Sequence, residues 1–318
     1  MSKRPSTPAA TVRKSTRTRK LQMIVRKNWE LYLLLIPTIL FFMIFRYYPM
    51  YGAQIAFRNF KITKGIWGSD WVGWKHFIRF VEGPYFKEIL KNTLTLSLYS
   101  LLVSTPLPII FAILLNYCKN KRFAKILQTV SYAPHFISTV VMVTLIQMFF
   151  SPQNGVVNAI IQAFGGEKFN FMASPEAFPH LYVWTGIWQS LGWSSIIYIG
   201  ALAGVSPELH EAAIVDGATI VQRIWHVDIP GILPTIIILL IMNTGNILSV
   251  GFEKVYLMSN SLNSSAAEVI STYTYKMGMQ QAQYSFSTAV GLFNSVINFT
   301  ILVIVNQIAR KTSESSIF

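Results

Sequence analysis

Neutral polar side chains inside two apolar segments are the residues of this chain best suited to binding a solute. Asn243 and Asn246 are three positions apart, and Trp184 and Trp188 are four apart, so each pair is expected on one face of a helix. An asparagine amide both donates and accepts hydrogen bonds, and an indole ring stacks on the C–H face of a sugar. Together with Gln189, these residues predict a pathway for a neutral, hydroxyl-rich solute.

Both pairs also have a purely structural explanation. Asparagines in apolar helices often hydrogen-bond to neighbouring helices. Tryptophans gather where a membrane helix reaches the lipid headgroups. The sequence alone leaves these alternatives open.

No residues are arranged for catalysis, cofactor binding or metal binding. The chain has no HExxH zinc motif, no GxSxG nucleophile motif and no GxxxxGK[ST] phosphate loop. Its single cysteine, Cys118, excludes Cys-rich zinc sites. The five histidines are scattered along the chain: His76, His135, His180, His210 and His226. We therefore predict no enzyme, no cofactor and no metal site, and expect ATP to be hydrolysed on another chain.

A polar segment of about thirty residues lies between two apolar blocks and is expected to form two short helices. Ser206 can cap the first helix, and Pro207 suits its first position. Gly217 can end it, because glycine readily adopts positive φ. A second helix is predicted over Ala218–Asp228 and should stop at Pro230.

The first of these helices carries residues that a partner could grip. Ala212 and Ala213 make a low surface that allows close approach, while Glu211 and Asp216 offer polar contacts. Such an insert in an apolar chain predicts a partner in the water phase. The alternative is an interfacial or re-entrant loop without a partner.

The rest of the chain is apolar enough to lie in a membrane. Of its 318 residues, 52% are hydrophobic and 13% are charged, against roughly 25% charged in soluble proteins. Apolar blocks of the length that crosses a bilayer are Leu31–Met50, Leu94–Leu115, Val130–Phe150, Leu181–Leu202, Ile232–Phe252 and Phe286–Ile308. They lack the amphipathic stripe of a soluble helix. The predicted fold is an all-α membrane protein with six transmembrane helices.

The distribution of basic residues predicts the orientation in the membrane. Residues 1–27 hold nine Lys or Arg and no acidic residue, which places the amino terminus in the cytoplasm. Alternation of six spans then puts loop 116–129, the polar segment 204–231 and the carboxyl terminus in the cytoplasm. The predicted organisation is a disordered tail over 1–28, a six-helix domain over 29–312 and a short tail over 313–318.

One outer loop departs from the charge rule. Residues 51–93 hold seven Lys or Arg, yet alternation puts them outside. The loop also holds the aromatic residues Trp67, Trp71, Trp74 and Phe77, which predict a small folded cap. The net charge of +14 is explained better by topology and by contact with anionic lipid than by nucleic acid.

The polar segment carries the motif of a known family. Glu211-Ala-Ala, then Gly217, then nine residues before Val227-Asp-Ile-Pro230 resembles the EAAxxxG…IxLP motif of ABC-importer permeases. Val227 and Ile229 are conservative departures, and Asp216-Gly-Ala218 fits the form common in sugar permeases. The runs Tyr32–Pro37, Trp71–Phe77 and Asn92-Thr93 extend the resemblance to roughly residues 30–310. The chain resembles the sugar and oligosaccharide branch of the MetI-like superfamily.

This resemblance implies a membrane-spanning permease subunit of an ATP-binding-cassette importer. Its cargo would be a sugar, expected to be a complex oligosaccharide, moved by alternating access across the bacterial cell membrane. The implied partners are a second homologous permease subunit, two cytoplasmic ATP-binding subunits and an extracytoplasmic solute-binding protein. The segment that couples to the ATPase, between helices 4 and 5, would comprise Glu211, Ala212, Ala213, Asp216, Gly217, Ala218 and Pro230.

Two alternatives to a sugar permease stay open. A permease for glycerol phosphate or amino acids would be expected to hold Arg or Lys deep in its spans, and the six apolar blocks offer none there. An intramembrane enzyme would need acid–base pairs or metal ligands at membrane depth, which the scattered histidines do not supply.

Overall fold

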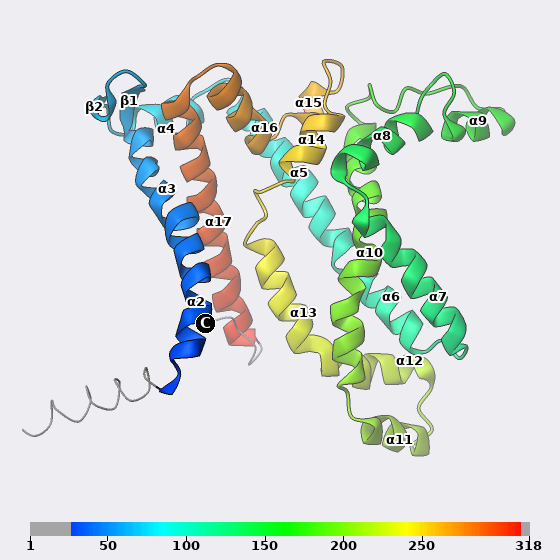
Figure 1. The fold of residues 1–318 in the computed structure, drawn as a ribbon. Helices are drawn as coiled ribbons and strands as arrows, with labels where there is room; N and C mark the ends of the chain where they lie inside the picture. Colours follow the sequence, from blue (N-terminus) through cyan, green and yellow to red (C-terminus); the bar gives the residue numbers. More distant parts are fainter. Residues whose placement is uncertain (1–26, 313–318) are drawn as a thin grey trace, which may run out of the picture. The chain divides into compact units, whose positions relative to one another are not determined.

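The computed structural model describes residues 27–312, which belong to two units divided between Ile55 and Ala56 (Figure 1). The described part of the first unit is helical: α2 (Trp29–Phe42), a π-helical turn (Met43–Tyr47) and α3 (Tyr48–Met50). This helix covers the predicted block Leu31–Met50. The expected tails over 1–28 and 313–318 lie outside the described residues, except for Lys27 and Asn28.

The second unit begins with a small folded cap. Strands β1 (Arg58–Lys61) and β2 (Gly65–Trp71) pair antiparallel, and helix α4 (Lys75–Val81) follows. Phe57 stacks on Trp71 with ring centroids 5.6 Å apart, and the guanidinium of Arg58 lies 5.5 Å from the Trp71 ring. Aromatic packing of this kind is what the composition of the predicted loop 51–93 indicated.

Long helices form where the apolar blocks lie. Helices α5 (Phe86–Ser104) and α6 (Pro106–Asn116) run together as a helix of 31 residues. Helix α10 (Ala177–Ala203) has 27 residues, and α17 (Tyr284–Thr312) has 29. The short α9 (Val156–Ala163) lies in the segment before α10.

The third apolar block, Val130–Phe150, is bent. Helix α7 (Lys121–Tyr132) and a 3₁₀ turn (Ala133–Phe136) are followed by α8 (Thr139–Phe149), and the two parts meet at 102°. Ile137 is extended at the break, and the Ser138 hydroxyl accepts a hydrogen bond from the Val141 N–H, which caps α8. The block Val130–Phe150 thus spans the end of α7, the bend and α8.

The polar segment folds as two helices, but the second does not stop where expected. Helix α11 (Pro207–Val215) is followed by α12 (Ile220–Arg223), a π-helical turn (Ile224–Asp228) and α13 (Ile229–Thr244), and the last three form one 25-residue helix. The helix continues through Pro230, which corrects the predicted stop. The wider π-helical turn before Pro230 relieves the clash that a proline makes with the preceding turn.

The fifth apolar block ends early. Helix α13 stops at Thr244, and residues 245–251 are non-helical before α14 (Phe252–Met258), so the helix predicted over Ile232–Phe252 is shorter than expected. Helices α15 (Ser264–Ala267) and α16 (Ile270–Tyr275) and a π-helical turn (Lys276–Gln280) then lead to α17.

Within residues 27–312, four helices are long and apolar enough to cross a membrane, and the bent α7–α8 pair makes a possible fifth span. Helix α10 is about 40 Å long at 1.5 Å per residue, but its more polar composition keeps it outside that set. The predicted number of six spans therefore stays a prediction.

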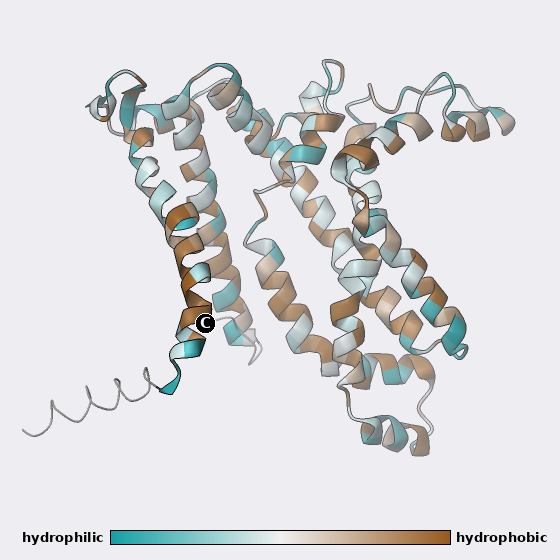
Figure 2. Ribbon diagram, viewed as in Figure 1, coloured by the Kyte–Doolittle hydropathy of each residue, from teal (hydrophilic) through white to brown (hydrophobic). Residues whose placement is uncertain are grey.

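Three clusters of buried apolar residues hold the second unit together. One joins α5, α8, α10 and α14, a second packs α4 on α5, α16 and α17, and a third joins α6, α10 and α13. Hydrophobic residues run along α13 and α17 (Figure 2). Helices α11 and α12 lie at the end of this unit opposite α9, α14 and α15 (Figure 1).

Candidate functional site

A polar cavity of about 210 Å³ lies between α5, α10 and the carboxyl end of α13. Asn243 and Asn246 both line it. They do not share a helix face as expected, because α13 ends at Thr244 and Asn246 lies in the turn that follows. The facing wall is a stripe of serines on α5: Ser97, Ser100 and Ser104. This stripe was not predicted, although its spacing of three and four residues is a helical signal.

A second cavity of about 210 Å³ adjoins the first, because Ser100, Ser104 and Tyr182 line both. Gln189 lines this second cavity, and its amide donates to the Ile137 carbonyl at 2.8 Å. That carbonyl is freed by the bend between α7 and α8. Gln189 therefore stabilises the bend as well as facing the cavity.

Trp184 and Trp188 lie elsewhere. They line a separate, apolar cavity of about 260 Å³ together with residues of α8 such as Met142, Ile146 and Phe149. The indole N–H of Trp184 donates to the Tyr99 hydroxyl at 2.8 Å. The structure thus places the two asparagines and the serines around one cavity, whereas the two tryptophans of α10 line a different one.

The non-helical residues after α13 form one wall of the first cavity. Asn298 of α17 holds this wall: its carbonyl oxygen accepts from the Leu248 N–H at 2.9 Å, and its amide donates to the Ser249 hydroxyl at 3.0 Å. Irregular backbone at membrane depth is tolerated where it lines a cavity and its polar groups are satisfied.

Lys254 also reaches the second cavity. It lies two residues beyond the predicted block Ile232–Phe252 and was therefore not predicted as a cation available to a solute. Because the chain leaves its helix at Thr244 and re-enters one at Phe252, α14 packs against α8 and α16 and carries the ammonium to the cavity wall.

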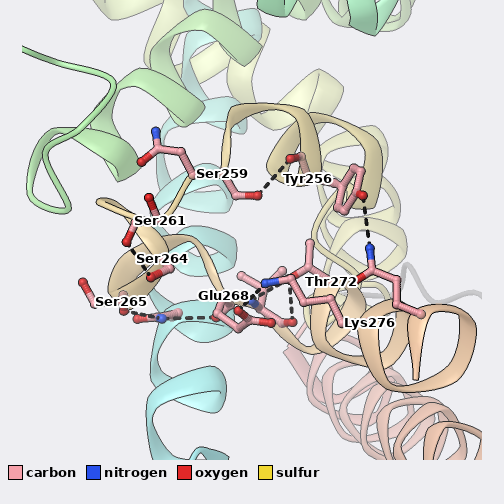
Figure 3. Close-up of polar contacts among 12 residues, drawn as sticks. Tyr256, Ser259, Ser261, Ser264, Ser265, Glu268, Thr272 and Lys276 are labelled. Atoms are coloured by element: carbon pink, nitrogen blue, oxygen red, sulfur yellow. Dashed lines mark hydrogen bonds and ion pairs between the residues drawn. The ribbon is translucent and has the colours of Figure 1, made fainter. Parts of the chain in front are cut away.

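A second polar cluster lies on α14–α16 and the turn after them (Figure 3). Lys276 and Glu268 form an ion pair at 2.6 Å beside a cavity of about 190 Å³. The Asn92 amide donates to the carbonyls of Ser265 and Glu268, and the Thr93 hydroxyl accepts from the Ile270 N–H. The Asn92-Thr93 pair noted in the sequence thus fastens the segment before α16 onto α5.

The end of α11 has the geometry expected for a glycine stop. Gly217 has φ +76°, its N–H donates to the Ile214 carbonyl at 3.0 Å, and the Ala218 N–H donates to the Ala213 carbonyl at 2.8 Å. These two bonds form a Schellman motif. Ser206 occupies the N-cap position, but its side chain makes no capping hydrogen bond.

Helix α11 has no buried residue. Glu211, Ala212 and Asp216 are exposed, and Ala213 and Ala218 are half-buried. Large apolar side chains are exposed as well: Leu209, Ile214 and Val215. An exposed apolar surface of this kind is typical of a surface that meets a partner.

A buried carboxylate connects α11 to the membrane helices. Asp228 is fully buried, and one of its oxygens lies 3.4 Å from Nε2 of His210 on α11. The other oxygen accepts from the Tyr117 hydroxyl at 2.7 Å. Burial and then this hydrogen bond raise the pKa of Tyr117 to about 12, so the hydroxyl stays a donor at physiological pH. Sequence patterns gave no sign of this contact, because its members are far apart in the chain.

Among residues 27–312, no group of three or more His, Cys, Asp or Glu side chains is placed to hold a metal ion. The described structure thus combines apolar helices, a hydroxyl- and amide-lined cavity and a projecting polar helix. This combination defines a class: a helical membrane protein built to pass a polar solute.

Comparison with known proteins gives the family. The family described as "Binding-protein-dependent transport system inner membrane component" matches residues 104–314. Two Bacillus subtilis (strain 168) proteins are similar along the chain. The polygalacturonan/rhamnogalacturonan transport system permease protein YteP is 41% identical over 314 residues, 99% of this chain and 98% of that protein. Protein LplB is 44% identical over 293 residues, 92% of each.

Solved structures agree with this result. A chain of a bacterial alginate ABC transporter, in complex with alginate pentasaccharide-bound periplasmic protein, matches with a TM-score of 0.87 and 38% identity. That match covers 94% of this chain and 100% of that chain. A bacterial ABC transporter involved in the import of the acidic polysaccharide alginate matches with a TM-score of 0.86 and 39% identity, covering 92% and 99%. The chain therefore belongs to the family of binding-protein-dependent transport system inner membrane components, with the MetI-like permease fold.

Proposed function

We propose that this chain is the permease subunit of an ATP-binding-cassette importer and that it carries an oligosaccharide into the cell by alternating access. The observation that carries the proposal is the cavity between α5, α10 and α13, whose walls present serine hydroxyls and the amides of Asn243 and Asn246. These groups donate and accept hydrogen bonds, which suits the hydroxyl groups of a sugar ring. The transport of polygalacturonan, rhamnogalacturonan and alginate by similar proteins supports the same class of cargo.

We assign six membrane spans: the helix from α2 to α3, α5–α6, the bent α7–α8 pair, α10, the helix from α12 through α13, and α17. Both termini and α11 are cytoplasmic in this assignment. Four basic residues support it, because they lie in and just after the turn between α6 and α7, at the end of the second unit that also holds α11 (Figure 1). They are Lys119, Lys121, Arg122 and Lys125.

Helix α11 is the coupling element in this proposal. Its exposed surface docks into a groove on a cytoplasmic ATP-binding subunit, and the carboxylate of Asp228 transmits its displacement to α13. A rigid helix held by a partner can transmit a movement between the two conformations that alternating access requires. A second homologous permease subunit, a second ATP-binding subunit and an extracytoplasmic solute-binding protein complete the importer.

Deletion of the gene that encodes this chain tests the proposal. The deletion strain should fail to take up one or more members of a panel of labelled oligosaccharides, and expression of the chain from a plasmid should restore uptake. Expression of the Glu211→Lys variant should not. Unchanged uptake of every oligosaccharide, with loss of uptake of a non-sugar solute, would show that the cargo assignment is wrong.

A further inference from the structure

Lys254, at the start of α14, is a buried cation without an acidic partner. Only 9% of its surface is exposed. Among residues 27–312, no carboxylate lies within 4.0 Å of its ammonium, whereas Lys276 of the second polar cluster is paired with Glu268. Burying a charge is costly unless an opposite charge or hydrogen bonds compensate it. The ammonium of Lys254 is therefore short of a counter-charge.

Helix α10 holds this ammonium at the cavity wall. Nζ donates to the Tyr182 carbonyl at 2.8 Å and lies 4.9 Å from the centroid of the Tyr182 ring. Gly186 leaves room for it, because a Cβ at that position would lie only 3.2 Å from Nζ. An ammonium has three donors, and Tyr182 accepts from one of them. Donors therefore remain for a group in the cavity.

The cavity beside Lys254 is lined by neutral polar groups and, among the described residues, by no acidic residue. Neutral donors and acceptors line the cavity beside Lys254: Ser100, Ser104, Gln189 and Ser190. Neither this cavity nor the adjoining one with the two asparagines has an Asp or Glu among its lining residues. A cation beside an acid-free hollow creates a positive potential, which attracts an anion and does not favour a neutral solute or a cation.

We propose that the ammonium of Lys254 binds a carboxylate on the transported sugar, while the neighbouring hydroxyl and amide groups bind its ring hydroxyls. The inference rests on the proposed function and adds that the cargo is an acidic oligosaccharide of the uronic-acid type. A carboxylate supplies the missing counter-charge and accepts a strong, charge-assisted hydrogen bond. Lys254 is then the residue of this subunit that selects cargo by charge.

The test uses the whole importer in proteoliposomes, with its partner subunits and solute-binding protein. The probes are trigalacturonate and its fully methyl-esterified form, which share their ring hydroxyls and differ at the carboxyl groups. Lys254→Met removes the charge and keeps an unbranched apolar side chain. We expect uptake of trigalacturonate to fall about ten- to a hundredfold, any uptake of the ester to be unchanged, and Lys254→Arg to restore part of the acid uptake.

A matched control and a stability measurement separate this role from a structural one. Lys91→Met removes an exposed charge on α5 and should leave acid uptake unchanged. Lys254→Met should leave the melting temperature of the complex unchanged or raise it, because a costly buried charge is lost. A lower melting temperature with equal loss of acid and ester uptake would mean that Lys254 only fastens α14 to α10.

Two other outcomes would also overturn the inference. One is wild-type uptake of the ester at least as fast as that of the acid. The other is uptake of glycerol 3-phosphate in place of either sugar, with the same dependence on Lys254. If the wild-type importer moves no oligosaccharide at all, the proposed function itself fails; if it moves them without any effect of Lys254, only this inference fails.

Discussion

The imidazole of His210 on α11 lies 3.4 Å from the carboxylate of Asp228, a fully buried residue directly before α13. The same carboxylate accepts a hydrogen bond from Tyr117 at the end of α6. One buried side chain thus joins the projecting helix to two membrane helices. Because Asn243 lies near the opposite end of α13, a displacement of α11 has a continuous packed route to the cavity.

Asp228→Asn should uncouple the importer in part. The substitution keeps the size of the side chain but removes the charge that faces His210 and accepts from Tyr117. We expect ATP hydrolysis to continue while the sugar imported per ATP falls at least roughly fivefold, the scale of a typical coupling energy. Glu167→Gln changes an exposed carboxylate outside α11 instead and should leave the amount of sugar imported per ATP unchanged. If Asp228→Asn imports as much sugar per ATP as the wild type, the contact between Asp228 and His210 does not take part in coupling.

Gly217 should tolerate asparagine better than alanine. Its φ of +76° costs an ordinary L-residue about 1 kcal/mol or more, and asparagine is the non-glycine residue that adopts this conformation most readily. ATP-dependent uptake should therefore be ranked glycine, then asparagine, then alanine, with the proline variant inactive although inserted in the membrane. Equal uptake in the alanine and asparagine variants would mean that the left-handed turn does not matter for coupling.

Asn298→Leu should destabilise the wall of the cavity. It removes two hydrogen bonds to the non-helical residues after α13, each worth about 1 kcal/mol, and leaves the Leu248 N–H unsatisfied. The melting temperature of the purified complex should fall and uptake should fall with it. Ser295→Ala on the same helix is the control, because that hydroxyl bonds to its own helix at the Gly291 carbonyl. Equal melting temperatures for the two variants would contradict the assignment.

Asparagine and tryptophan substitutions should have different effects on transport. Asn243→Leu changes the polar cavity, whereas Trp188→Leu changes the apolar one beside α8. We expect uptake to fall about tenfold or more in the first variant, since a hydrogen-bond partner of the sugar is lost, and to change little in the second. A comparable loss of uptake in both variants would mean that the tryptophans also belong to the solute pathway.

Local signals in the sequence predicted the helices well. Pro207 and Gly217 mark the ends of a helix because the conformations they favour are needed there, and both positions agree with α11. The spacing of Asn243 and Asn246 predicted a shared helix face, which is wrong because α13 ends at Thr244. Both residues still line one cavity, Asn243 from the helix and Asn246 from the turn after it.

Tertiary contacts account for what the sequence could not predict. The break after Thr244 is held by Asn298, which binds the Leu248 N–H from fifty positions away, and the bend after α7 is held by Gln189. Hydropathy records only how apolar a stretch is, so it extended both blocks through these breaks. Lys254 was not predicted either, because it reaches the cavity only when α14 packs against α8 and α16.

Transport by the assembled importer is the most direct test of the account. The measurement is ATP-dependent accumulation of a labelled oligosaccharide in proteoliposomes, for the wild-type chain and for the Asn243→Leu, Asn246→Leu double variant. We predict accumulation that requires ATP in the wild type and at least a tenfold loss in the double variant, with assembly of the complex unchanged. Wild-type rates in the double variant, or no accumulation of any oligosaccharide by the wild type, would contradict the account.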